Sequence, residues 1–487
     1  MGVFLLLATL LLQRIGSADV CTGIEAVEAL VVQRIASHDE WLFPRQNSGQ
    51  PTFKPPLFHW SAVGLQRALG LGETTAGSVR LASAGWALAT ALATMWIARR
   101  ALGADTALLA GLALAAMTPF VGEGRFGRVD MALAFFETLA LAAFVGWLGA
   151  RAGDGVDPPA PERARARRAT GWLYLLAVAM GAAVLTKGPV GALVPGAAIV
   201  AFLLLERRPG EIASLLRPGP LVVGGILASS FYVACWWSGR LEFLQRQVEW
   251  ENLRRFSGDL GTMKPWYYVV PVLLGAAPIS LLVPWAVARA LAGRPSAPGA
   301  TDASCRQARP VLRLLAVFWL VTVVFFSLAA YKRRAYLLPT WPAAAVLLAA
   351  LVGSIDFRWR GLDARRAFLA ACGVLVLVNL LWLPWKEQRE CRGGSQRVIA
   401  DGLRSALGPD EPVHLQGLDE EVWAPLLFYL GREAPLNETG TLAGAPPGAI
   451  LLSRDAWTAA RVHEPGWVEV SSFEQGPEKL VLVRRAS

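Results

Sequence analysis

Two carboxylates and a lysine stand out in the polar stretch from Cys21 to Trp60. Glu25 and Glu28 are three residues apart, a spacing that places both on one face of a helix. Lys54 lies between Phe53 and a pair of prolines, which restrict its backbone. Acids and a restrained base on a long polar loop between apolar segments are typical of a reaction site at one side of a membrane.

More cations occur in short breaks between the later apolar runs, beside Gly, Pro or aromatic residues. They are Arg125, Arg128, Lys187, Lys264, Lys332 and Arg333, the last two followed by Tyr336. Cations at a membrane edge suit a lipid phosphate. The alternative is that they extend to lipid headgroups without any further role. Their recurrence in separate breaks favours the phosphate site, with Lys54, Arg128, Lys187 and Lys332 as its ligands and Arg125, Lys264, Arg333 and Tyr336 as support.

Carboxylates beside these cations indicate acid/base work or binding of a divalent metal ion. Besides Glu25 and Glu28, the candidates are Asp130, which begins an apolar run, and Asp259. Asp130 fits equally well as a negative charge at a helix N-terminus that pairs with the same cations. We expect Glu25 and Asp130 to be catalytic, and the metal stays open.

The elements that must position these residues are apolar runs, each about long enough to cross a membrane. A shorter run at 3–12 comes first, and about eleven spans are expected in all. The others are 80–98, 105–121, 129–149, 171–186, 188–205, 219–237, 266–288, 312–330, 336–353 and 367–385. The sequence therefore predicts an all-α polytopic membrane domain over 1–385. Residues 21–79 form its first outer loop, with an amphipathic helix at 56–70.

The remaining residues, 386–487, read as a soluble α/β domain. VIADGLRSAL predicts a helix, and PVHLQGL, AILLSR and KLVLVRR predict strands. Arg residues gather in alternate breaks, for example around residues 99–100, 151–168, 207–217 and 358–366. By the positive-inside rule these breaks are cytoplasmic, so the N-terminus is inside and the C-terminal domain outside.

Composition excludes other classes. The chain is 54% hydrophobic and only 17% charged, which favours a membrane protein over a soluble one. The net charge of +10 comes mainly from Arg in the short breaks, so it does not indicate a nucleic-acid partner. The five cysteines are scattered, and neither a disulfide framework nor a zinc site is expected.

Several motifs together resemble the GT-C polyprenyl-phosphate-sugar glycosyltransferases, in particular relatives of protein O-mannosyltransferases and of the lipid A aminoarabinose transferase. The resemblance extends over roughly residues 20–345 in a shared order. The motifs are Glu25-Ala26, Phe43-Pro44-Arg45, Lys54-Pro55-Pro56-Leu57 with Trp60, Arg128 to Asp130, Thr186-Lys187-Gly188-Pro189, Glu251-Asn252-Leu253 with Arg255-Phe256, Lys264-Pro265-Trp266-Tyr267-Tyr268, and Tyr336-Leu337-Leu338-Pro339.

The resemblance implies an enzyme of the bacterial inner membrane that moves a sugar from a polyprenyl phosphate to a lipid A-like, glycan or protein acceptor. The family carries an Asp-Glu pair in its first outer loop. Here Glu25 matches the Glu, but Ile24 stands where the Asp is expected. Asp19 is too far upstream to align, though it could substitute in space. An acceptor that is itself a phosphate would need no base.

Two other classes compete with this interpretation. A polytopic lipid or solute transporter would be expected to show repeated halves, which the sequence does not show. A non-catalytic scaffold that presents the C-terminal domain would not need acids and cations together at one membrane edge.

Overall fold

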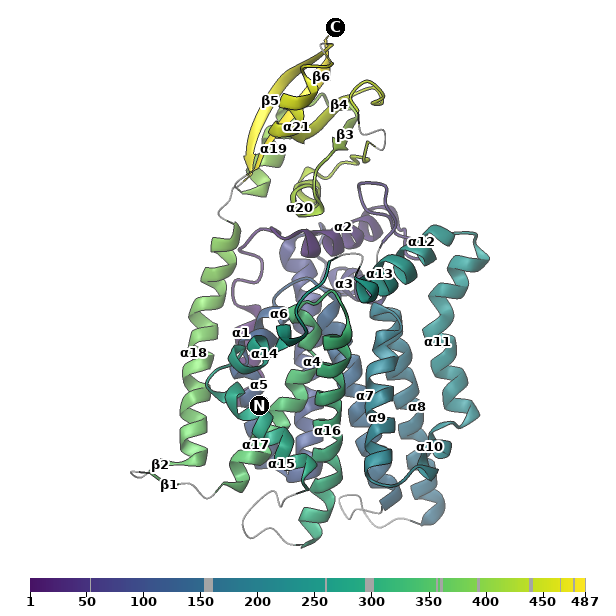
Figure 1. Ribbon diagram of the computed structural model, residues 1–487, viewed down its shortest axis with the longest axis vertical. Helices are drawn as coiled ribbons and strands as arrows, with labels where there is room; N and C mark the ends of the chain where they lie inside the picture. The colour runs from purple at the N-terminus through teal and green to yellow at the C-terminus, as the bar shows by residue number, and fades with distance from the viewer. Residues whose placement is uncertain are drawn as a thin grey trace.

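The computed structural model describes residues 1–52, 54–152, 161–258, 261–293, 302–355, 358–359, 362–391, 395–437, 441–464, 466–475 and 478–486. Asp259, one of the predicted acids, lies outside them. Most of the described chain is helical, and a small β-sheet forms near the C-terminus (Figure 1).

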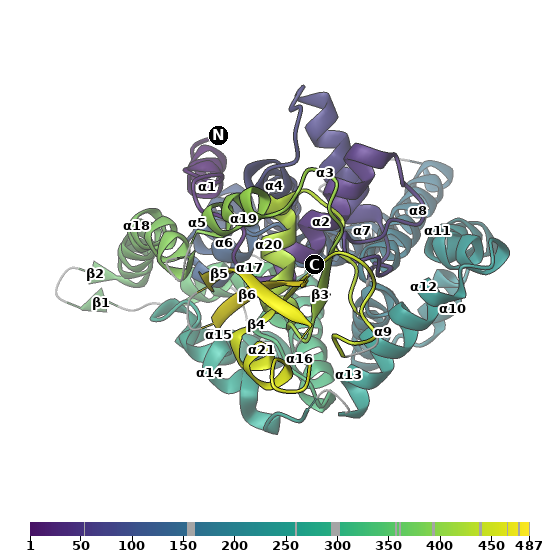
Figure 2. The same cartoon turned by 90° about the horizontal axis from the view of Figure 1, so that it is seen from above.

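Six helices among the described residues are long and apolar enough to cross a membrane. They are α4 (Ala76–Leu102), α7 (Val129–Ala152), α8 (Glu162–Lys187), α11 (Pro218–Trp237), α16 (Asp302–Leu328) and α18 (Ala364–Glu390). Side chains of α7 are almost all buried, so this helix lies inside the bundle, whereas α11 is largely exposed at its periphery (Figure 2). Helix α18 continues beyond the predicted end of the last span at residue 385.

Two of the predicted spans are bent rather than straight. The first consists of α5 (Ala104–Ala116) and α6 (Thr118–Gly124), which meet at 72°. The second joins η2 (Pro265–Tyr268) and α14 (Val269–Leu274) to η3 (Ile279–Leu282) and α15 (Val283–Leu291), with a bend of 119°. Prolines at these breaks remove backbone donors that a continuous helix needs.

Three shorter apolar helices complete the bundle: α1 (Gly2–Leu12), α9 (Val190–Leu205) and α17 (Thr340–Ser354). The predicted total of about eleven spans requires that these helices and both bent pairs each cross the membrane, and it stays a prediction.

Short helices cover the end of the bundle that faces the C-terminal domain (Figure 1). They are α2 (Gly23–His38), α3 (Leu57–Ala68), α12 (Leu241–Gln245), the π-helix η1 (Arg246–Leu253) and α13 (Arg254–Ser257), with η4 (Arg334–Leu337) following α16. Helix α2 begins at Thr22, whose side chain accepts a hydrogen bond from the Glu25 amide. Helix α3 confirms the helix expected at 56–70. The opposite end carries α10 (Gly210–Leu215) and a hairpin of β1 (Arg358–Trp359) and β2 (Leu362–Asp363).

The C-terminal domain is a four-stranded mixed sheet with three helices. It consists of α19 (Gln396–Ala406), β3 (Val413–Gln416), α20 (Glu420–Leu430), β4 (Ala449–Ser453), α21 (Arg454–Ala460), β5 (Trp467–Gln475) and β6 (Glu478–Arg485). The strand order is β3-β4-β6-β5, with β3 and β4 parallel. This confirms the helix and the three strands expected from the sequence, and adds β5, α20 and α21.

The C-terminal domain shares a hydrophobic core with the first loop. Leu426 and Leu427 of α20 belong to the same buried cluster as Leu30 and Val31 of α2. The apolar side chains that α20 and α2 bury against each other hold the C-terminal domain on the bundle.

A disulfide joins Cys21, just before α2, to Cys391 at the end of α18. The expectation that the scattered cysteines form no disulfide is therefore wrong. The expectation failed because the two cysteines are 370 residues apart, and spacing in the sequence cannot relate residues at that separation. The bond fixes the start of α2 to the base of the C-terminal domain.

Candidate functional site

Four charged groups meet where the chain enters α7, at the end of the bundle below α2. The guanidinium of Arg128 is 3.0 Å from Glu123 Oε2 and 3.5 Å from Asp130 Oδ2. The Lys187 ammonium, at the end of α8, donates a short hydrogen bond to Asp130 Oδ1. The structure thus brings together Arg128, Asp130 and Lys187, which the sequence predicted from separate breaks.

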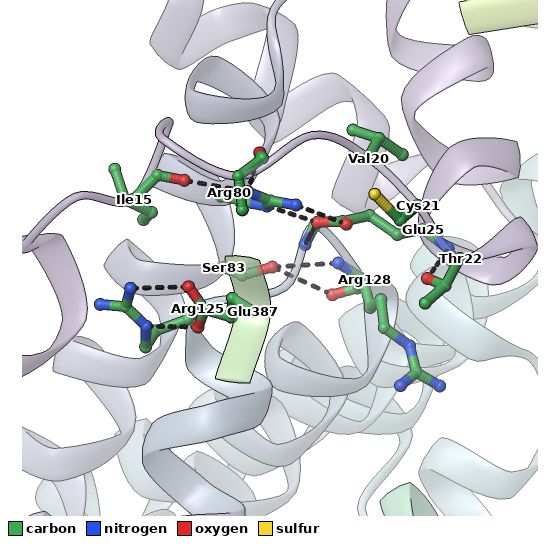
Figure 3. Close-up of polar contacts among 12 residues, drawn as sticks. Ile15, Val20, Cys21, Thr22, Glu25, Arg80, Ser83, Arg125, Arg128 and Glu387 are labelled. Atoms are coloured by element: carbon green, nitrogen blue, oxygen red, sulfur yellow. Dashed lines mark hydrogen bonds and ion pairs between the residues drawn. The ribbon is translucent and has the colours of Figure 1, made fainter. Parts of the chain in front are cut away.

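The backbone of Arg128 is held from α4. The Ser83 hydroxyl accepts a hydrogen bond from the Arg128 amide at 3.1 Å and donates one to its carbonyl at 3.3 Å (Figure 3). The amide and the carbonyl of Arg128 are therefore both fixed. Its side chain points away from the Arg80–Glu25 and Arg125–Glu387 ion pairs (Figure 3). Burial lowers the pKa of Arg128, but the charges of Glu123 and Asp130 outweigh it and hold the pKa above its ordinary value. The group is a permanent, positioned cation.

Tyr336 lies against this group, and Lys54 acts on it electrostatically. The Lys187 ammonium is 4.8 Å from the centre of the Tyr336 ring, a cation–π distance, and that ring packs on Phe326. Lys54 is buried, and its charge acts on Asp130. We call Lys54, Arg128 and Lys187 the cation cluster.

Lys332 makes different contacts. Its ammonium donates to the backbone carbonyls of Ala329 at 2.5 Å and Met263 at 3.2 Å, so it joins the end of α16 to the segment that precedes η2. The residues beside it are also used locally: Arg333 lies over the Tyr331 ring, and the exposed Lys264 lies over Trp266. The phosphate contact predicted for Lys332, and the support predicted for Lys264 and Arg333, stay predictions.

Arg125, predicted to support the phosphate site, is committed to the scaffold. Its guanidinium makes a two-bond contact with Glu387 of α18, at 2.6 and 2.8 Å (Figure 3). It also donates to the carbonyls of Leu10 and Gln13. It is 1% exposed. These contacts tie α1 and α18 to the start of α7, so we leave Arg125 out of the proposed site.

Glu25 forms a buried ion pair with Arg80 of α4. Arg80 Nε lies 2.7 Å from Oε1 and Nη2 lies 2.8 Å from Oε2 (Figure 3). Oε1 also accepts a hydrogen bond from the Gly127 amide at 2.9 Å. A side chain at Gly127 would approach Val79 to 2.6 Å, so glycine is required for this contact. Because both oxygens are occupied, the geometry supports a structural role, and the catalytic role expected of Glu25 stays a prediction.

Asp19 does not take the place of the Asp missing at position 24. It pairs with Arg397 at 3.0 Å and accepts a hydrogen bond from Ser395, both at the start of the C-terminal domain. Its role is to fasten that domain to the first loop.

Glu28 faces a partner that the sequence analysis did not connect to it. Its Oε2 is 2.6 Å from Nε2 of His59 on α3, and both side chains are buried. Arg80, Glu123 and Glu387 were also missed. Arg80 and Glu387 lie far along the chain from their partners Glu25 and Arg125, so no spacing in the sequence signals these two pairs. Glu123 is only five residues before Arg128, and that pair was within reach of the sequence. Among the described residues, no three His, Cys, Asp or Glu side chains gather as a metal-ligand set, and a role for a divalent ion remains a hypothesis.

Comparison with known proteins agrees with this architecture. Residues 52–240 match the family described as dolichyl-phosphate-mannose-protein mannosyltransferase. The chain resembles the undecaprenyl phosphate-alpha-4-amino-4-deoxy-L-arabinose arabinosyl transferases of Pseudomonas aeruginosa (29% identity, 74% of this chain and 62% of the relative) and Erwinia tasmaniensis (29%, 63% and 52%). The chain thus spans between half and two thirds of the length of these curated relatives.

The solved structures define the fold. ArnT from Cupriavidus metallidurans bound to undecaprenyl phosphate superposes with a TM-score of 0.79 at 21% identity, covering 99% of this chain and 98% of that one. The archaeal oligosaccharyltransferase AglB from Archaeoglobus fulgidus gives a TM-score of 0.52 at 13% identity, with 93% and 69% covered. The protein has the GT-C fold. Its fold is similar to that of the Cupriavidus ArnT structure over almost the whole chain, in line with the motif resemblance.

Proposed function

We propose that the chain is a membrane glycosyltransferase that moves a sugar from a polyprenyl phosphate to an acceptor at the outer face of the bacterial inner membrane. The observation that carries this proposal is the cation cluster, held at one end of a GT-C bundle. Such a cluster is suited to bind the phosphate of a lipid. The Cupriavidus protein, whose fold this chain shares, binds undecaprenyl phosphate.

The arrangement suits the chemistry of glycosyl transfer. When the sugar leaves, the polyprenyl phosphate gains negative charge, which nearby cations stabilise most where water is scarce. Arg128 and Lys187 are both largely buried and already oriented by Asp130, so little reorganisation is required. The apolar helices would hold the polyprenyl tail, and α2 with the C-terminal domain would cover the acceptor.

A direct assay tests the proposal. Purified protein in lipid nanodiscs is incubated with a radiolabelled polyprenyl-phosphate sugar, and loss of label from the lipid is followed. We expect label to leave the donor. Donor that crosses vesicle bilayers without losing its sugar would instead indicate a transporter. The same assay with a chelator shows whether a divalent ion is needed.

Orientation is a separate prediction. We expect the N-terminus in the cytoplasm and the C-terminal domain in the periplasm. The alternation of Arg-rich breaks motivates this, and the Cys21–Cys391 disulfide supports it, since disulfides persist in oxidising compartments. Alkaline phosphatase fused to the C-terminus should be active, since it folds in the periplasm. Green fluorescent protein fused at the same place should be dark, since it does not fold after export through the Sec pathway. The reverse result would place the cation cluster at the cytoplasmic face.

A further inference from the structure

The loop between α2 and α3 contains a turn whose polar side chains are buried without a partner. The Gly49 amide donates to the Gln46 carbonyl at 2.8 Å, and the Gln46 amide donates to the Gln50 carbonyl at 2.9 Å. Gln46 is 1% exposed and Ser48 is 4% exposed. No described residue forms a hydrogen bond with the side-chain oxygen or nitrogen of Gln46, or with the Ser48 hydroxyl. Because buried polar groups in native proteins are hydrogen-bonded in the large majority, these three atoms require a partner.

The surrounding chain fixes this turn from three sides. Asn47, inside the turn, donates to the side chain of Gln33 on α2 at 3.3 Å. The Asn47 carbonyl accepts a hydrogen bond from the Ala434 amide of the C-terminal domain at 2.9 Å. From η1, Arg246 donates to the side chain of Gln50. The loop thus lies between the C-terminal domain and α12 (Figure 1), and its backbone is held although two of its side chains have no partner in the described chain.

The turn lies within reach of the cation cluster. Thr52 closes the hairpin that contains it, since the Thr52 amide donates to the Pro44 carbonyl at 3.4 Å. The Thr52 hydroxyl accepts a hydrogen bond from the amide of Lys54 at 3.4 Å, so the hairpin leads directly into the cation cluster. Gln50, which pairs with Gln46, precedes Lys54 by four residues, which span at most about 14 Å. A ligand whose phosphate binds Lys54 therefore has the turn within reach of a group attached to that phosphate.

The unpaired groups select a neutral ligand that is rich in hydroxyls. The amide of Gln46 offers two N–H donors and a carbonyl acceptor, and the Ser48 hydroxyl offers a donor and an acceptor. Neither side chain is charged, so a phosphate binds better to the nearby cations than to this pair. A hydrocarbon chain has no hydrogen-bonding groups at all. A sugar presents several hydroxyls close together, and in the proposed donor it is attached to the phosphate.

We propose that Gln46 and Ser48 bind the hydroxyl groups of the donor sugar while the cation cluster binds its phosphate. The inference rests on the proposed glycosyltransferase function and assigns the sugar subsite of the donor. Because the turn is held in place by its neighbours, little freedom is lost when the sugar binds. The hydroxyls of a saccharide acceptor have the same chemistry, and the experiment separates these two sources.

The test compares binding of undecaprenyl phosphate with and without a sugar. Wild type and Gln46→Met in nanodiscs are titrated with undecaprenyl phosphate, undecaprenyl phosphate mannose and undecaprenyl phosphate arabinose. Methionine keeps the side-chain length but removes both polar atoms. Loss of two neutral hydrogen bonds lowers affinity by roughly 5- to 150-fold. We expect that loss for at least one sugar-bearing lipid, with unchanged affinity for undecaprenyl phosphate and unchanged KM for an alkyl glycoside acceptor.

Melting temperatures separate this effect from a general loss of fold. Gln46→Met replaces an unpaired buried amide with apolar atoms, so the melting temperature without ligand should stay the same or rise. Gln66→Met is the matched control, because Gln66 of α3 is also buried but accepts a hydrogen bond from Thr74 at 3.2 Å. It should lower the melting temperature and keep wild-type affinity for the sugar-bearing lipids. Ser48→Ala should weaken their binding by roughly 2- to 10-fold, and it supplies the test if Gln46→Met does not fold.

Each contrary outcome has its own meaning. Wild-type affinity of Gln46→Met and Ser48→Ala for all three lipids would overturn the inference, since the two side chains would then bind water only. An equal loss for all three lipids would also overturn it, because the cation cluster itself would be distorted. A change confined to KM for the alkyl glycoside would assign the turn to the acceptor instead of the donor. A wild type that binds these lipids but transfers no sugar disproves the proposed function and leaves the binding result intact.

Discussion

Replacing Arg128 with Gln is expected to lower kcat/KM for the polyprenyl-phosphate sugar by roughly 10- to 150-fold. A charge-assisted contact contributes about 1.5–3 kcal/mol, which converts to that range. Gln keeps much of the side-chain length but loses the positive charge that Glu123 and Asp130 hold in position. Initial rates at several donor concentrations measure the effect.

Lys187→Met and Lys54→Met should show losses of similar size, because each removes one charge from the cation cluster. The matched control is Arg167→Ala, an exposed cation of α8 located toward the other end of the helix from Lys187. A wild-type rate in all three cluster variants, combined with a loss in Arg167→Ala, would place the donor phosphate at the opposite face.

Arg128→Lys refines the same prediction. A lysine keeps the charge but not the planar fork that reaches Glu123 and Asp130 at once. We expect an intermediate rate. Full activity in Arg128→Lys would mean that charge alone is required at this position.

The sequence selected Arg128 and Lys187 in separate breaks, and the structure brings both onto Asp130. Lys54, Arg128 and Lys187 each stand beside Gly, Pro or an aromatic residue, and Arg128 and Lys187 also lie at the ends of apolar runs, where buried charge is costly unless it is paired or functional. The same local signal also selected Lys332, which the structure shows bonded to two backbone carbonyls. A cation that holds a loop and one that binds a ligand have the same sequence environment.

Long-range pairing was beyond the reach of the sequence. Arg125 and Glu387 are 262 residues apart, and Cys21 and Cys391 are 370 apart. Helical periodicity relates only residues within a few turns, so it predicts which face a side chain occupies but not which helix packs on that face. For this reason Glu28 could be recognised as a candidate acid, whereas its partner His59, 31 residues later on another helix, could not be connected to it.

The bends in two predicted spans occur at prolines that the sequence shows, but a proline alone does not predict a bend. Pro119 and Pro278 stand at the breaks, yet Pro195 and Pro310 are inside continuous helices. Proline removes one hydrogen bond in every case, and the packing of neighbouring helices determines whether the helix bends or continues.

Breaking the ion pair between Glu25 and Arg80 is expected to have the largest effect on stability. Arg80 is 3% exposed and Glu25 is 1% exposed. Removing one partner leaves the other charge buried without compensation, which costs about 3–5 kcal/mol. Glu25→Gln and Arg80→Met should each lower the melting temperature strongly and reduce the yield of folded protein.

The double variant Glu25→Gln/Arg80→Met decides what Glu25 does. It removes both charges, so it should recover much of the melting temperature lost by either single variant. Because both Glu25 oxygens are occupied by Arg80 and Gly127, we expect turnover to recover along with the fold. Recovery of folding and of undecaprenyl phosphate binding without recovery of turnover would instead assign the chemistry to Glu25, as its position in the sequence first indicated.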